Sequence, residues 1–100
     1  MELDGRVAVV TGAASGLGFA TCQQLAAAGA RIAAFDLAEE GLERVRDGIS
    51  GVPVSTHQVD VADEQSVQKA VNDAAAEHGG VHLAVNCAGV ADAAKTVSKG

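Results

Sequence analysis

The chain has 100 residues, with 13 acidic against 7 basic side chains and a formal net charge of -6. Nucleic-acid binding depends on clustered Lys and Arg, so this balance argues against nucleic-acid and membrane-surface partners. No stretch approaches the about 18 apolar residues of a membrane span, and residues 1–6 lack the apolar region of a secretory signal. We therefore expect a cytoplasmic protein in which Cys22 and Cys87 are reduced thiols without metal-ligand spacing.

The amino-terminal half of the chain alternates strand and helix patterns. Residues 6–11 form a short apolar run rich in β-branched side chains, which predicts a strand buried on both faces. A helix is predicted over 16–28, where Gly29 would end it, and its expected apolar face comprises Leu17, Ala20, Thr21, Leu25 and Ala28. Residues 32–35 repeat the buried-strand pattern and end at Asp36.

The alternation continues in the second half. Apolar residues at helical spacing predict a second helix that closes near residues 51–53, namely Leu42, Val45 and Ile49. A third strand is expected over 54–59, followed by a third helix with Asp63 as N-cap that ends at 78–80. The expected apolar stripe of that helix comprises Val67, Ala70, Val71, Ala74 and Ala75. Residues 81–86 predict a fourth strand, and 87–100 show no strong pattern.

This order predicts an α/β fold, a Rossmann-type parallel sheet with helices on both faces, comprising the first four strands of a doubly wound fold. The expected strand order is 3-2-1-4, so a ligand crevice would lie at the carboxyl ends of the first and fourth strands. If the fourth strand is the sheet edge, Val81, Leu83 and Val85 would lack cover. Residues 1–100 alone are then expected to aggregate or to be poorly stable.

Three glycines follow the first strand in the segment Thr-Gly-Ala-Ala-Ser-Gly-Leu-Gly, residues 11–18. Gly12 would allow a tight turn, Gly16 a close approach to a pyrophosphate, and Gly18 close packing of helix on strand. The N-terminus of the helix offers free N–H groups to a diphosphate. A P-loop would need Lys after the last glycine, and a nucleophile elbow would need glycines flanking Ser15. A turn that merely connects two elements is the alternative.

Two aspartates follow strands. Asp36 lies eighteen residues beyond Gly18, where its carboxylate could accept hydrogen bonds from a ribose 2′- and 3′-hydroxyl pair. A 2′-phosphate would be repelled, so NAD is preferred over NADP. Asp60 and Val61 could meet an adenine edge and ring. A helix-cap role is the alternative for both aspartates.

The fourth strand ends in Asn86-Cys87-Ala88-Gly89, whose small residues would let a dinucleotide lie across the backbone, although a tight turn is also compatible. Together these motifs resemble the short-chain dehydrogenases/reductases, whose Asn-Asn-Ala-Gly motif has Cys at its second position here. The resemblance implies an NAD-dependent oxidoreductase with Ser15 and Leu17 near the diphosphate. The cofactor-binding residues it implies are Gly12, Ser15, Gly16, Leu17, Gly18, Asp36, Asp60, Val61, Cys87, Ala88 and Gly89.

Residues 85–100 are similar, more narrowly, to the type II 3-hydroxyacyl-CoA dehydrogenases. This similarity implies oxidation of a 3-hydroxyacyl-CoA or another secondary alcohol to a ketone. The resemblance to the family implies a homotetramer when the protein is complete. The chain would be the NAD-binding amino-terminal portion, residues 1–100, of one dehydrogenase domain. The sequence holds no Tyr, so the Tyr-x-x-x-Lys pair of the family is missing and no catalytic residue is assigned.

Other titratable residues carry no predicted chemistry. Lys95 and Lys99 are expected to be solvated loop charges, with contact to a CoA phosphate as the alternative. The spacing of the three histidines, His57, His78 and His82, does not suggest a metal site, and His78 is expected at a helix C-terminus where positive charge is favoured. A non-catalytic NAD-binding module is the second functional hypothesis, and an AdoMet-binding methyltransferase is the third.

Overall fold

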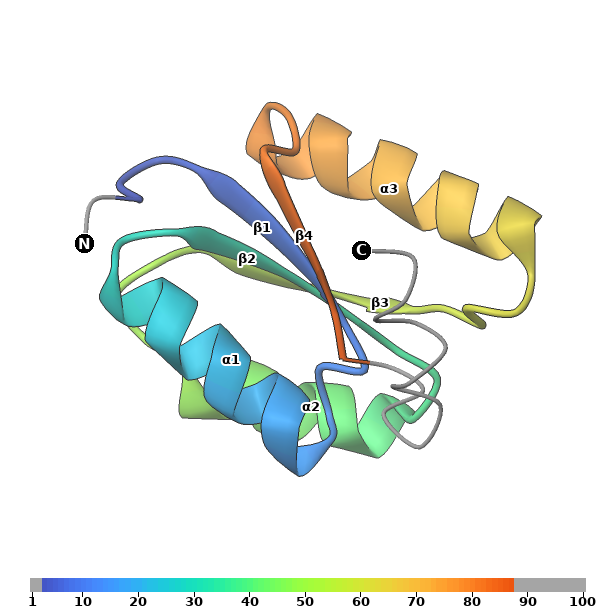
Figure 1. The fold of residues 1–100 in the computed structure, drawn as a ribbon, viewed down its shortest axis with the longest axis horizontal. Helices are drawn as coiled ribbons and strands as arrows, with labels where there is room; N and C mark the ends of the chain where they lie inside the picture. Colours follow the sequence, from blue (N-terminus) through green and yellow to red (C-terminus); the bar gives the residue numbers. More distant parts are fainter. Residues whose placement is uncertain (1–2, 88–100) are drawn as a thin grey trace, which may run out of the picture.

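A computed structural model describes residues 3–87 of the chain as a parallel sheet between two layers of helices (Figure 1). The elements follow one another as predicted, namely β1 (Val7–Thr11), α1 (Gly16–Ala27), β2 (Arg31–Asp36), α2 (Glu39–Gly48), β3 (Val54–Gln58), α3 (Glu64–His78) and β4 (Leu83–Asn86). All strand pairs are parallel and the order is β3-β2-β1-β4, which confirms the expected topology. Predicted boundaries differ from these by no more than two residues at the strands.

The sheet has a core on each face, as its continuous apolar runs predict. Side chains of β1 alternate between the two cores, and the four residues Val7–Val10 are all buried. One core lies under α1 and α2 and includes Ile32, Leu42 and Val45. The other lies under α3 and includes Phe35 and Ala74. Helices thus cover both faces of the sheet, and the parallel strands all end at the same edge.

The buried face of α1 differs from the predicted one. Leu17 is 57% exposed, and Ala20 is also exposed, whereas Gly18 and Cys22 are buried. Leu25 and Ala26 pack partly against the same core. The helix is rich in Ala and Gly, so its sequence gives little contrast between faces, and close approach to the sheet selects the face with the smallest side chain.

The other two helices match their predicted patterns. Asp63 is the N-cap of α3, with its carboxylate accepting hydrogen bonds from the backbone of Gln65 and Ser66, and Gly79 ends the helix in the left-handed conformation at φ 88°. Ile49 follows the last residue of α2 but is still buried. Within residues 3–87, β4 is one edge of the sheet, and its apolar residues Leu83 and Val85 pack partly against the core under α1.

Candidate functional site

The carboxyl ends of β1 and β4 lie side by side, at the point where the strand order reverses. Thr11 Oγ1 donates a 2.7 Å hydrogen bond to Asn86 Oδ1, and the backbone N–H of Cys87 donates to the Thr11 carbonyl at 2.9 Å. The predicted glycine loop leaves β1 at this point. Two motifs separated by about 75 residues in sequence therefore meet at one end of the sheet.

The loop has the backbone geometry that its glycines suggest. Gly12 has a φ of 68°, a backbone conformation that residues with a Cβ rarely adopt. A Cβ at Gly18 would lie 1.9 Å from the Gly12 carbonyl oxygen, so only glycine allows this approach of α1 to the loop. Ser15 is the N-cap of α1, since its Oγ accepts from the Gly18 N–H at 3.0 Å and donates to the Gly12 carbonyl at 2.7 Å.

The first turn of α1 presents hydrogen-bond donors. The Ser15 hydroxyl and carbonyl accept from the N–H groups of Gly18 and Phe19. Within residues 3–87, the N–H groups of Gly16 and Leu17 find no acceptor, as expected for the first positions of a helix. Both residues are exposed, so these donors and the positive end of the helix dipole are accessible to an anion.

Asp36 is the last residue of β2 and is half-buried beside the loop. One carboxylate oxygen, Oδ2, accepts from the Ala14 N–H at 3.0 Å, and the other, Oδ1, accepts from the Ala38 N–H at 2.9 Å. The alternative that Asp36 is the N-cap of α2 is wrong, because the N-cap is Ala38, which makes no side-chain cap bond. Asp36 instead connects the end of β2 to the glycine loop.

Asp60 forms a similar turn after β3, with Oδ1 accepting from the Ala62 N–H at 3.0 Å. Because Asp63 caps α3, the helix-cap alternative for Asp60 is also wrong. The residue after each aspartate is a large exposed apolar side chain, Leu37 at 61% and Val61 at 49%. Leu37 was not predicted as a site residue, although the order Asp-apolar-Ala at 36–38, repeated at 60–62, places it in the same position as Val61.

The remaining predicted residues divide in two. Cys87 is buried beside α1, where its Sγ donates to Thr21 Oγ1 at 3.8 Å. The other predicted residues of this segment lie outside the described residues, namely Ala88, Gly89, Lys95 and Lys99. Cys22 lies in the same core as Cys87, and both are free thiols. Burial, reinforced by Cys87, raises the pKa of the Cys22 thiol to about 12, so Cys22 is not a nucleophile at neutral pH.

Two histidines meet at a buried serine between β3 and α3. Ser55 Oγ lies 2.8 Å from Nε2 of both His57 and His78, and Arg31 Nε donates to His78 Nδ1 at 3.4 Å. Burial lowers the pKa of both histidines, and Arg31 lowers that of His78 further. Burial and Arg31 thus oppose the positive charge that was expected on His78 at the helix C-terminus. His82 lies just before β4, and its Nδ1 accepts a hydrogen bond from the Val7 N–H at 3.0 Å.

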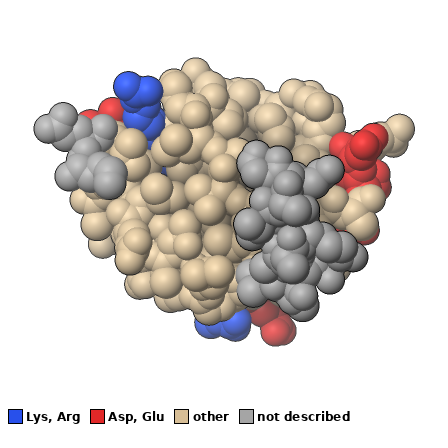
Figure 2. All heavy atoms as spheres, viewed as in Figure 1, with Lys and Arg blue, Asp and Glu red and all other residues tan. Residues whose placement is uncertain are grey.

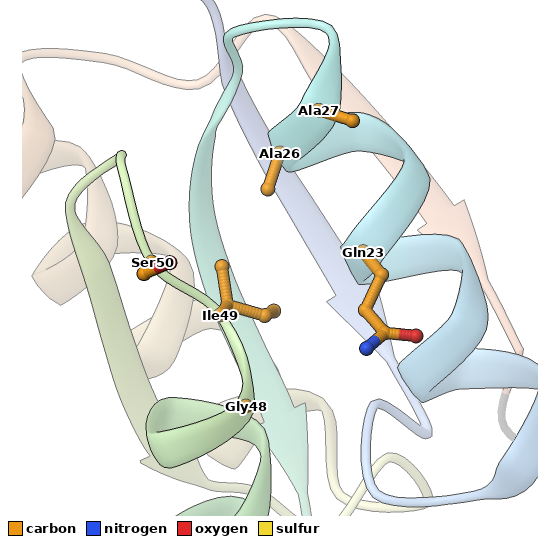
Figure 3. A pocket seen from close by; sticks show the side chains of 6 residues that line it. All are labelled: Gln23, Ala26, Ala27, Gly48, Ile49 and Ser50. Carbon is orange, nitrogen blue, oxygen red and sulfur yellow. The ribbon is translucent and has the colours of Figure 1, made fainter.

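A shallow groove of about 230 Å³ lies between α1 and α2 (Figure 3). It is lined by Gln23, Ala26, Ala27, Gly48, Ile49 and Ser50, and the Gln23 side chain projects toward it. These residues belong to the C-terminal halves of the two helices and the turn after α2, whereas the glycine loop precedes the first turn of α1. The groove is therefore separate from the candidate site.

On the face seen in Figure 2, the charged side chains of the described residues lie at the margins. The described residues of this face thus offer a polyanion no basic patch. Among the helices of residues 3–87, none has the length and apolar character needed to cross a membrane.

A family model described as short chain dehydrogenase matches residues 6–99 of the chain. D-threitol dehydrogenase from Mycolicibacterium smegmatis is 50% identical over 93 residues, which cover 90% of this chain and 35% of that protein. Human 3-hydroxyacyl-CoA dehydrogenase type-2 is 44% identical over 95 residues, covering 95% of this chain and 36% of that protein. The chain therefore spans about a third of the length of the curated relatives it matches.

Solved structures share the fold. A 3-ketoacyl-(acyl-carrier-protein) reductase from Brucella melitensis, complexed with NADH, superposes with a TM-score of 0.78 at 34% identity, covering 83% of this chain and 34% of that one. NAD+-bound xylitol dehydrogenase has a TM-score of 0.77 at 32% identity, covering 84% of this chain and 33% of that one. The Rossmann-type arrangement predicted from the sequence is confirmed.

Proposed function

The chain belongs to the short-chain dehydrogenase family, and from this premise we propose that it is the NAD-binding amino-terminal portion of an oxidoreductase. The reaction would transfer hydride between the nicotinamide and a secondary alcohol or ketone. When bound, the dinucleotide supplies the hydride acceptor or donor. The residues described here would bind and orient it, and the proton-transfer residues would lie outside residues 1–100, because these contain no Tyr.

The observation that carries this proposal is that N–H donors without an acceptor in residues 3–87 lie at the same end of the sheet as a carboxylate. The N–H groups of Gly16 and Leu17 suit a diphosphate, and Asp36 suits the neighbouring ribose. A 2′-phosphate placed about 4 Å from this carboxylate would meet repulsion of about 4 kcal/mol per charge pair before screening by solvent. Asp36 therefore supports NAD over NADP.

Apolar side chains would complete the adenosine end of the site. Leu37 and Val61 are exposed beside the turns at Asp36 and Asp60, and Asp60 could meet the adenine edge. An aromatic base packed on Leu37 and Val61 would remove apolar surface from water, which would stabilise binding by about 25 cal/mol per Å². Cys87 with Ala88 and Gly89 would lie under the adenosine, as the family resemblance implies.

The substrate proposal is a 3-hydroxyacyl-CoA, supported by the relative at 44% identity. A polyol is the second candidate, because D-threitol dehydrogenase is 50% identical. Assays of NADH formation by the protein at its natural length, with a short-chain 3-hydroxyacyl-CoA and with D-threitol, would decide between them. Turnover of neither, together with tight NAD binding, would favour the alternative of a non-catalytic NAD-binding module. A cytoplasmic homotetramer is part of the proposal.

The experiment that tests the cofactor role is a comparison of NAD and NADP binding by the natural-length protein and its Asp36→Ala variant. We expect the parent to prefer NAD by at least about tenfold, a difference of about 1.4 kcal/mol. The variant should bind NAD more weakly and lose most of this preference. Equal discrimination by parent and variant would contradict the role of Asp36. Failure of the parent to bind either dinucleotide would refute the proposed function.

A further inference from the structure

Ala14, in the middle of the glycine loop, is held from two directions. Its N–H donates to Asp36 Oδ2 at 3.0 Å, across 22 residues of sequence. On another side it touches the first turn of α2, where a Cβ at Gly41 would lie 2.3 Å from the Ala14 Cβ. The neighbouring Ala13 N–H donates to the Phe35 carbonyl at 3.1 Å. The loop is thus bonded to the end of β2 and packed against α2.

The Asp36 carboxylate has the capacity for this contact and for a ribose together. A carboxylate offers about four acceptor positions, two on each oxygen. The Ala14 N–H occupies one position on Oδ2, and the Ala38 N–H occupies one on Oδ1. Among residues 3–87, one position on each oxygen remains, and the ribose of an adenosine 5′-diphosphate has two free hydroxyls, 2′ and 3′. Binding a ribose therefore does not require Asp36 to release the loop.

We propose that Asp36 is a positioning residue for the glycine loop, in addition to the ribose contact on which the proposed function relies. Ala14 directly precedes Ser15, the N-cap that bonds the Gly12 carbonyl and the Gly18 N–H. Movement of Ala14 would move this cap and, with it, the diphosphate donors at the start of α1. Through Ala14, the carboxylate holds the diphosphate half of the site in register with the ribose half.

Hydrogen exchange in the ligand-free protein tests the loop contact without reference to any ligand. In the natural-length protein, Asp36→Ala should accelerate amide exchange over residues 12–18 by at least about tenfold, since the loop loses a bond to a charged acceptor. Asp60→Ala is the matched control, because it removes the equivalent turn bond to Ala62 but no bond to the loop. Unchanged exchange in Asp36→Ala would overturn the proposal.

Binding of ADP and of 2′,3′-dideoxy-ADP separates the loop role from the ribose role. These probes share the adenine and the diphosphate, but only ADP has the two hydroxyls. If Asp36 holds the loop, Asp36→Ala should weaken 2′,3′-dideoxy-ADP by about tenfold and ADP by more. If Asp36 acts only on the ribose, the variant will bind 2′,3′-dideoxy-ADP as the parent does, and the proposal fails.

Gly41→Ala provides a second variant that leaves the carboxylate intact. The added methyl group would displace Ala14, so loop exchange should accelerate and both probes should weaken by the same factor. An unchanged loop in this variant would contradict the packing half of the argument. If the parent binds neither probe nor NAD, the proposed function fails, while the exchange measurements still decide whether Asp36 positions the loop.

Discussion

Replacement of Gly18 by alanine should separate the structural role of the glycine loop from its binding role. The added Cβ would lie 1.9 Å from the Gly12 carbonyl oxygen and 2.9 Å from the Ala13 Cα. Carbon–oxygen contacts in proteins are about 3.3 Å or longer, so α1 and the loop must separate by more than about 1 Å. That shift would disturb the Gly12 carbonyl, which accepts both the N–H and the hydroxyl of Ser15.

Overpacking costs about 1–3 kcal/mol, and a weakened N-cap adds about 1 kcal/mol. Higher helix propensity returns up to about 1 kcal/mol, so we expect Gly18→Ala to lower the free energy of unfolding by about 2 kcal/mol. Urea titration of the natural-length protein measures this value. Gly16→Ala is the control, because its φ is not positive and, among the described residues beyond its own turn and chain neighbours, no atom lies within 4 Å of the added Cβ.

Gly16→Ala should retain or slightly raise the free energy of unfolding but weaken NAD, since the methyl group would occupy the approach of the diphosphate. The same urea titrations and an NAD titration distinguish the two variants. A Gly18→Ala protein within about 0.5 kcal/mol of the parent would refute the packing argument, given the usual range for harmless substitutions. Parent-like NAD affinity in Gly16→Ala would refute the assignment of this glycine to the diphosphate.

Three further predictions concern the remaining polar contacts. The pKa values of His57 and His78 are lowered from 6.5, so the unfolded state binds more protons and the free energy of unfolding should fall as the pH drops through about 6.5. In urea titrations, a double variant with His57→Gln and His78→Gln should lose less stability on acidification. A parent protein that gains stability on acidification would contradict this prediction. Asp63→Ala should lower the free energy of unfolding by about 1 kcal/mol, because it removes the N-cap of α3. Asp73→Ala should lower it by less than about 0.5 kcal/mol, since the ion pair of Asp73 with Lys69 is exposed. Equal losses in urea titration would be inconsistent with the cap. Cys22, with a pKa of about 12, should react with a thiol reagent only after unfolding, and labelling of the native protein, read by mass spectrometry, would disprove its burial.

Sequence periodicity was sufficient for the topology because the two central strands, β1 and β2, are short apolar runs. The runs at Val7–Thr11 and Arg31–Asp36 alternate with helices, and parallel pairing with right-handed crossovers then leaves few arrangements. Periodicity was insufficient for the buried face of α1. That helix offers Ala, Gly, Cys and Thr on most sides, and the choice of Gly18 and Cys22 depends on how closely its backbone approaches the sheet.

The candidate site was predicted in location but not in its internal bonds. The glycine motif and Asp36 could be assigned to one end of the sheet because parallel strands place their carboxyl ends together. The bond from Ala14 to Asp36 and the Ser55 cluster with its two histidines depend on contacts between elements distant in sequence. No local pattern marks such contacts, because the interacting residues share neither an element nor a spacing.

The two Asp-apolar-Ala turns show how tertiary contacts assign different roles to similar local sequences. At 36–38 and at 60–62, the carboxylate accepts from the N–H two residues later, and the intervening apolar side chain is exposed. The spacing of Asp36 after Gly18 favours Asp36 for the ribose, but the local sequence around the two aspartates does not distinguish them. Of the two, within residues 3–87, Asp36 alone also bonds the glycine loop, and this bond places it beside the segment that leads into α1. Because a ribose lies next to its phosphate, this bond supports the proposed assignment of Asp36 to the ribose and of Asp60 and Val61 to the adenine.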